Sequence, residues 1–180
     1  MKNLTLLLSF IFSLTLLCSC ESDDDDMRAI ESRGSFSIDN DTFGLRFGFD
    51  TPVQEDSPNL YYKTILLSSE GYVLTQNNQL EGAADVVIME VYSDQQNFEI
   101  EGTYSITDNQ AVSGQVEMYF AINYDIQNDT LDREEDIESG TLTITKNENN
   151  TYVFTINNGV VDIVGNDFKL NYNGFVTTLN

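Results

Sequence analysis

The chain of 180 residues contains no histidine and no tryptophan, and it has only two cysteines and two prolines. Histidine-based catalytic triads are therefore excluded, and so are zinc sites built from histidine and cysteine. The sequence also lacks the Gly-x-Ser-x-Gly and Ser-x-x-Lys motifs, the P-loop and the dinucleotide fingerprint. Any enzyme built from this chain would have to use carboxylates, tyrosine, lysine or a hard metal ion.

Basic residues are scarce as well. Eight Lys and Arg stand against 30 Asp and Glu, which gives a formal net charge of −22. A chain this acidic repels phosphate backbones and has no basic stripe for counterion release, so we expect no nucleic-acid partner. Two readings of the charge remain open: solubility through mutual repulsion, and attraction of divalent cations or cationic ligands.

Long apolar runs are absent except at the N-terminus. There Lys2 precedes a nearly uninterrupted apolar stretch over residues 4–17. A membrane-spanning helix needs about 20 apolar residues, and this run is shorter, so residues 1–19 are predicted to form a signal peptide. No later segment of the sequence has this character.

The two cysteines stand at the end of that run. Cys20 follows the small residue Ser19, with aliphatic Leu17 two positions further upstream, whereas Cys18 directly follows bulky Leu17. A small residue before the modified cysteine is what lipoprotein processing requires, so Cys20 is predicted to carry lipid, including palmitate. Several acyl chains would hold the protein on a membrane, because each buried methylene contributes roughly 0.8 kcal/mol. The alternative is a secretory peptide cut at another small residue.

An acidic run follows this cysteine almost at once, formed by Asp23, Asp24, Asp25 and Asp26. In this respect the sequence resembles the surface lipoproteins of Bacteroidetes. The resemblance implies export to the outer leaflet of the outer membrane and exposure on the cell surface; a plain solvated spacer is the alternative. Residues 20–34 are expected to be the lipidated cysteine and its acidic tether, and residues 35–180 a single domain.

The body of the chain shows alternating apolar residues in short runs. Phe43, Leu45, Phe47 and Phe49 occupy every second position of one run, as expected on one face of a β-strand. Further strands are predicted at 60–67, 86–92, 98–106 and 116–124. With about ten strands and no amphipathic helix, the predicted fold is all-β, an antiparallel sandwich or a closed barrel.

The C-terminal third is predicted to be an antiparallel meander that ends in a closing hairpin. Residues 147–150 and the pairs Asn158-Gly159, Gly165-Asn166 and Asn173-Gly174 are typical turn sequences between apolar runs. Gly102-Thr103-Tyr104 and the stretch 139–146 are similar to uncharacterised small β-rich lipoproteins of the same bacteria. That likeness implies a shared architecture and no catalytic residue.

One pair of carboxylates has a spacing that suits catalysis. Glu99 and Glu101 alternate with Phe98 and Ile100, so on a strand they would lie on one face about 6 to 7 Å apart. This is close to the separation in inverting glycoside hydrolases. An ordinary solvated strand face gives the same pattern.

A second acidic group lies on a predicted long loop between two strands. Asp125, Asp129, Asp132 and Asp136 could supply the oxygen ligands of Ca²⁺, although their spacing is not that of an EF-hand. A mobile solvated loop is the alternative. Within it, Asp129-Thr130-Leu131 resembles the Asp-Ser/Thr-aliphatic motif of protein O-glycosylation in Bacteroidetes, so Thr130 is a candidate glycosylation site.

Three tyrosines are candidates for ligand binding. Tyr61 and Tyr62 precede an apolar strand, and Tyr119 shares the polar face of another strand with Glu117 and Asn123. Aromatic rings beside hydrogen-bonding groups suit a sugar ring, but tyrosine also packs well within sheets.

Together these patterns indicate a non-enzymatic, surface-anchored lipoprotein of the outer membrane whose β-domain binds a glycan or a protein. Two alternatives stay open. One is a carboxylate-dependent glycan hydrolase that uses Glu99 and Glu101, and the other is a structural envelope protein.

The lipid prediction has a matched control within the chain. Cys20→Ser removes the thiol that would receive the lipid, so the protein should lose its label in metabolic labelling with palmitate and leave the detergent phase on partition. Cys18→Ser should leave both properties unchanged. Labelling that survives Cys20→Ser would contradict the assignment of the modified cysteine.

Overall fold

The structure is a computed structural model that describes residues 33–77, 79–161 and 165–179. These residues form strands and connecting turns without a helix, as predicted for an all-β fold. The described part therefore contains no helix that could cross a membrane. The strands are β1 (Gly34–Ile38), β2 (Asp41–Leu45), β3 (Phe47–Asp50), β4 (Gln54–Ser57), β5 (Leu60–Ser68), β6 (Tyr72–Leu74), β7 (Leu80–Ser93), β8 (Gly102–Thr107), β9 (Gln115–Asp125), β10 (Arg133–Lys146), β11 (Tyr152–Val161), β12 (Asn166–Gly174) and β13 (Val176–Thr178).

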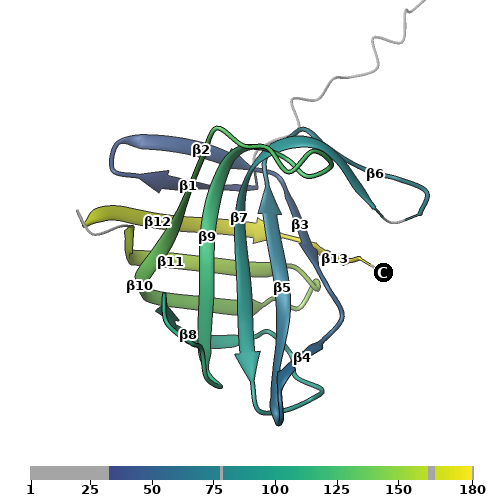
Figure 1. Cartoon of the computed structure of the whole chain (residues 1–180), viewed down its shortest axis with the longest axis vertical. Coiled ribbons are helices and arrows are strands. Elements are labelled where there is room, and N and C mark those ends of the chain that lie inside the picture. Colours follow the sequence, from purple (N-terminus) through teal and green to yellow (C-terminus); the bar gives the residue numbers. More distant parts are fainter. Residues whose placement is uncertain (1–32, 78, 162–164, 180) are drawn as a thin grey trace, which may run out of the picture. The chain divides into compact units, whose positions relative to one another are not determined.

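These strands belong to one curled sheet that forms a half-barrel (Figure 1). Its order is β13-β3-β5-β7-β9-β8-β10-β11-β12-β1-β2, with β4 added beside β5 and β6 beside β7. Most neighbours are antiparallel, and β8 with β9 and β13 with β3 are the parallel pairs among them. The consecutive strands β10, β11 and β12 pair antiparallel, as the predicted meander requires.

Strand β10 belongs to both halves of the sheet. Its first residues, 133–136, pair with β9, residues 139–144 pair with β8, and residues between Ile137 and Lys146 pair with β11. The register with β11 shifts between Ile137 and Thr143, and within this stretch Gly140 adopts a φ of +140° that suits glycine. Figure 1 shows the result: β5, β7 and β9 run side by side, and β11, β12 and β1 cross them.

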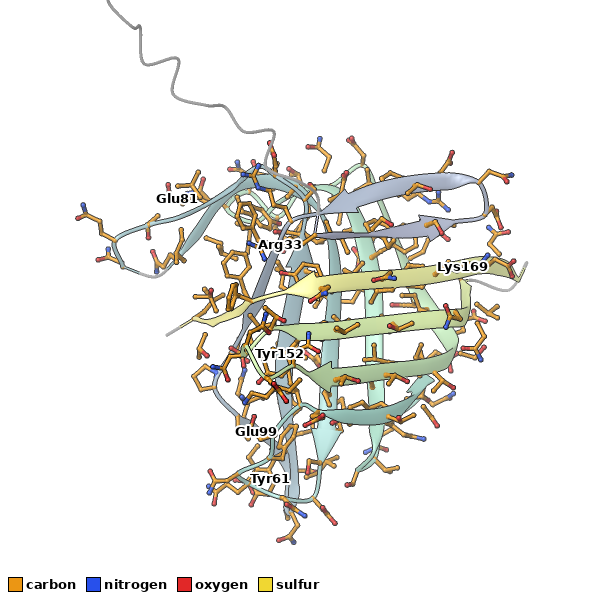
Figure 2. All side chains as sticks on the ribbon, turned by 180° about the vertical axis from the view of Figure 1, so that it is seen from behind. Arg33, Tyr61, Glu81, Glu99, Tyr152 and Lys169 are labelled. Carbon is orange, nitrogen blue, oxygen red and sulfur yellow. The ribbon has the colours of Figure 1, made fainter. Side chains whose placement is uncertain are left out.

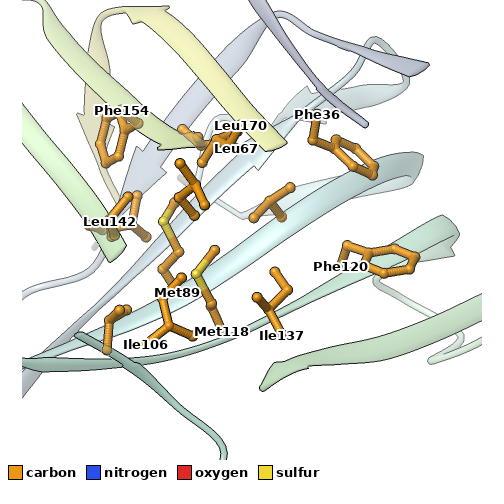
Figure 3. Close-up of a cluster of buried hydrophobic side chains, with 14 of the residues drawn as sticks. Phe36, Leu67, Met89, Ile106, Met118, Phe120, Ile137, Leu142, Phe154 and Leu170 are labelled. Carbon is orange, nitrogen blue, oxygen red and sulfur yellow. The ribbon is translucent and has the colours of Figure 1, made fainter. Parts of the chain in front are cut away.

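The main core fills the space between the two halves. Its members come from both halves and are buried, among them Phe36, Leu67, Met89, Met118, Phe120, Ile137, Leu142, Phe154 and Leu170 (Figure 3). Four phenylalanines, Phe36, Phe43, Phe120 and Phe168, lie against one another with ring centroids 4.9 to 6.2 Å apart. With no disulfide predicted in the mature chain, this packed apolar core is the main source of stability.

A second apolar cluster covers part of the opposite, outer face of the sheet. It is formed by Phe49, Leu66, Tyr72, Leu80, Ala84, Val86, Ile88 and Ala121. Tyr72, on β6, donates its hydroxyl to the carbonyl oxygen of Tyr124 at 2.9 Å, which ties the β6 hairpin to the end of β9. The outer face is therefore apolar where this hairpin covers it.

The predicted single strand over Phe43 to Phe49 is wrong. It is divided at Arg46 into β2 and β3, which occupy places near opposite ends of the sheet. Phe43 and Leu45 pack in the main core, whereas Phe49 packs in the outer cluster. The alternating pattern continues across Arg46, but the chain changes its place in the sheet there, and its two halves serve different cores.

Two of the predicted turns are also wrong. Asn158-Gly159 lies inside β11 at a register shift, which makes it a β-bulge rather than a turn. After Gly174 the chain does not fold back on β12, because β13 pairs parallel with β3 instead. The turn at residues 147–150 is confirmed, with Asn150 at a φ of +62°.

Candidate functional site

A pocket of about 230 Å³ opens on the outer face of the sheet, beside the second apolar cluster. It is lined by Glu90, Thr107, Asp108, Glu117, Met118, Tyr119 and Asp136, which come from β7, β9, β10 and the end of β8. This set combines an aromatic ring, a hydroxyl and four carboxylates, whereas the side chain of Met118 is buried in the main core. The set offers both apolar contact and hydrogen-bond acceptors to a small ligand.

The pocket lies at a fork in the sheet. On one side of β9, Gln115 and Val116 pair with β8, whereas residues 119–122 pair with β10. Glu117 and Met118 stand between these two regions and have no register partner on that side. The separation of β10 from β9, with β8 entering between them, produces the opening.

Strand pairing fixes the positions of the carboxylates. Glu90 on β7 lies directly opposite Glu117 on β9, and Tyr119 on β9 lies directly opposite Asp136 on β10. Directly opposite side chains on one face are within contact range, so the register alone brings Glu90 and Glu117 together. Both glutamates are partly buried, and Asp136 is exposed.

Tyr92 connects the two glutamates. Its hydroxyl donates to Oε2 of Glu90 at 3.0 Å and is 3.4 Å from Oε2 of Glu117. Burial raises the pKa of Tyr92 strongly, and the charge of Glu90 raises it further, so the hydroxyl keeps its proton and remains a donor. Oε1 of Glu117 accepts from the backbone N–H of Ala111 at 3.0 Å, which holds the neighbouring loop against the pocket.

The charge of the lining is entirely negative. Within the described ranges, Lys and Arg form ion pairs with Asp50, Glu70, Glu99 and Glu135, and none of these acids lines the pocket. Burial raises the pKa of Tyr119 to about 12, and Glu134 adds to the shift. Tyr119 is therefore a neutral phenol at neutral pH and can both donate and accept.

The structure separates the three predicted ligand-binding tyrosines. Tyr119 lines the pocket. Tyr62 stacks on Tyr92 with ring centroids 5.7 Å apart and donates to Oε1 of Gln54 at 3.1 Å, so it extends the aromatic surface next to the glutamate pair. Tyr61 is the neighbour of Tyr62 on β5 and points to the opposite face of the sheet, near the end that also carries Glu99 (Figure 2).

The four aspartates predicted as possible Ca²⁺ ligands contact different neighbouring groups. Asp125 accepts from the backbone N–H groups of Gln127 and Asn128, and the side-chain amide of Asn128 lowers its pKa. Among the described residues, no group of three or more His, Cys, Asp or Glu side chains is placed to hold a metal ion.

The other three aspartates have different neighbours. Asp129 accepts from the hydroxyl of Tyr124 at 3.2 Å, and Asp132 from the side-chain amide of Asn123 at 3.2 Å. Asp136 belongs to the pocket. The predicted long acidic loop is wrong in extent, because β10 begins at Arg133 and only residues 126–132 connect the two strands.

The predicted strand over residues 98–106 is wrong in its first part. β8 begins only at Gly102, so Glu99 and Glu101 do not lie on one strand face. Glu99 is exposed and lies 3.6 Å from the ammonium of Lys146, whose backbone N–H donates to Glu101 at 3.4 Å. The apolar residues beside them, Phe98 and Ile100, pack on the core, and this burial produced the alternating pattern.

Sequence reasoning did not identify Glu90, Glu117 and Tyr92 as one group. Glu90 and Tyr92 occupy alternate positions of a strongly apolar strand, and Glu117 lies on the polar face of β9. The polar positions within these two strands were a usable signal, but only the register shows that they meet.

Cys20 and the run Asp23 to Asp26 lie outside the described residues.

Thr130 lies in the connection between β9 and β10. It is exposed, and its backbone pairs with that of Asp125 in an isolated bridge. Leu131 beside it is exposed as well. The side chain predicted to be glycosylated is therefore accessible at a fixed turn.

Comparison with known proteins adds no name to this geometry. No family model, no curated protein and no solved structure matches the chain.

The free energy of unfolding should depend on alkaline pH through the ionisation of Tyr119. Its pKa is raised from 10.0 to about 12 in the folded protein, so between these values the unfolded chain releases a proton that the folded protein retains. The free energy of unfolding should therefore fall as pH rises from 10 to 12. Denaturant titrations should show that Tyr119→Phe makes this fall shallower than in the unmodified protein. Parallel curves for the two proteins would contradict the shift.

Proposed function

We propose that this chain is an outer-membrane lipoprotein, anchored through Cys20 and exposed on the cell surface, whose β-domain binds a saccharide without catalysing its cleavage. The anchor and its location rest on the signal sequence and the acidic run after the cysteine. The binding function rests on one observation, the pocket at the fork between β8, β9 and β10.

The composition of the pocket favours a sugar ring. Tyr119 offers an aromatic face, and Thr107 and the carboxylates offer acceptors for hydroxyl groups. Its volume of about 230 Å³ is below the range of about 300–1,000 Å³ that is usual for drug-sized ligands. We therefore expect it to hold one ring, either a free monosaccharide or one unit of a longer glycan.

The rigid surroundings support binding. Glu90, Glu117 and Tyr119 stand on the central strands of the sheet, and residues next to them in sequence, Met89 and Met118, are buried in the core. Side chains on such strands are held more accurately than side chains on loops.

We also infer that the half-barrel closes as a barrel, because β2 at one end of the sheet continues through Arg46 directly into β3, near the other end.

The binding proposal predicts a saccharide ligand whose affinity depends on Tyr119. Tyr119→Ala removes the aromatic wall and should weaken binding about tenfold, in line with about 1–3 kcal/mol for loss of a stacking or hydrogen-bonding partner. Calorimetric titration of the purified protein with the hit from a monosaccharide and glycan panel measures this change.

Tyr61→Ala is the matched control, because Tyr61 faces away from the pocket. It should leave the affinity unchanged. A panel without a single hit, together with capture of a protein partner from native membranes, would contradict a saccharide function.

The surface location predicts that protease added to intact native cells releases peptides from residues 35–180. Detection by mass spectrometry measures the release, with a periplasmic protein of the same cells as the control for lysis. Protection of these residues until the outer membrane is opened would contradict export to the surface.

A further inference from the structure

We propose that the pocket prefers a sugar ring that carries a protonated amine, so its ligand class is the amino sugars rather than neutral sugars. This inference rests on the proposed saccharide function and names the chemical group that the pocket selects. It is carried by the geometry of the two glutamates, the charge of the lining and the shape of the opening.

Glu90 and Glu117 form a pair of like-charged side chains at the pocket. They stand directly opposite each other on neighbouring strands, an arrangement in which like charges repel. Among the described contacts, the hydroxyl of Tyr92 is the hydrogen-bond donor between the two carboxylates. It donates to Glu90 and lies close to Glu117. A ligand ammonium beside this pair would supply the positive charge that the protein side chains do not.

The lining of the pocket has more hydrogen-bond acceptors than donors. Ionised carboxylates only accept hydrogen bonds, and four of them line the pocket, where the hydroxyls of Thr107 and Tyr119 are the side-chain donors. An ammonium group has three donors and no acceptor, so it complements such a lining. A neutral hydroxyl also donates well to a carboxylate, but it has a single donor and brings no positive charge to offset the charge of the lining.

The lining of the pocket suits an organic cation better than a metal ion. The described residues include no group of three or more His, Cys, Asp or Glu side chains that could hold a metal ion. Tyr119 adds a half-buried aromatic wall, which a ring can contact and a bare ion does not need. The ammonium would lie at the Glu90–Glu117 side, and the ring would lie toward Tyr119.

The test compares glucosamine with glucose, which share a ring and differ in the amine. The whole chain, produced in its native host and purified in detergent, is titrated with each sugar in a calorimeter. Glucosamine should bind at least about tenfold more tightly, because its ammonium adds the attraction of opposite charges to the hydrogen bonds that both sugars can make with the carboxylates. Added salt should weaken glucosamine binding and leave glucose binding unchanged.

Two variants assign the preference to the pocket. Glu90→Gln keeps the shape and an acceptor for Tyr92 and removes one charge, so it should abolish most of the preference for glucosamine. Glu117→Gln should do the same, although Glu117 also holds the loop at Ala111. Glu148→Gln, at an exposed turn residue away from the pocket, changes the net charge equally and should have no effect.

The outcomes separate this inference from the proposed function. Equal affinities for the two sugars, both lost in Tyr119→Ala, would overturn the amine preference and leave saccharide binding supported. A preference for glucosamine that survives Glu90→Gln and Glu117→Gln would reflect general attraction to an acidic protein and would also overturn it. No binding of either sugar, with no hit in the glycan panel, would overturn both.

Discussion

Strand β10 is the constraint on which the rest of this structure depends. It pairs with β9 through its first residues and with β8 and β11 through its later ones, so it must turn within one strand. Gly140 makes this possible: its φ is +140°, and a Cβ there would come within 2.9 Å of the Cα of Gly159. The turn brings the two halves of the sheet face to face, which buries the apolar core between them. Without it the same strands would leave one broad apolar face in water.

The candidate site is a consequence of that turn on the opposite face. As β10 leaves β9, β8 enters beside it, and Glu117 and Met118 remain at the opening without a register partner on that side. The strands that carry Glu90, Glu117 and Tyr119 are held by the core beneath them, which fixes the backbone positions of these three residues. The charged side chains of the lining are all acidic, as are most charged residues of the whole chain.

The predictions from sequence were most accurate where burial alone determines the pattern. The strands at 60–67, 86–92 and 116–124 and the β10–β11–β12 meander lie where the apolar alternation placed them. The errors share one cause: the alternation of apolar residues indicates which side chains are buried, but it does not indicate which strands pair. Phe98 and Ile100 are packed on the core from a non-strand segment, and the run through Arg46 serves two different clusters. Asn158-Gly159 has the composition of a turn, but the tertiary structure uses it as a bulge.

The sequence by itself determined the all-β class, the acidic charge and the residue types available for chemistry, because composition and local periodicity are properties of the chain alone. It also supplied Tyr119 and Asp136 as candidates, each for its own reason. Only the tertiary structure decided that these two residues are cross-strand neighbours and that Glu90 meets Glu117. It also decided that Glu99 and Glu101 contact Lys146 and do not share one strand face. Strand register sets which side chains meet, and it depends on contacts between residues far apart in the sequence, which local patterns do not encode.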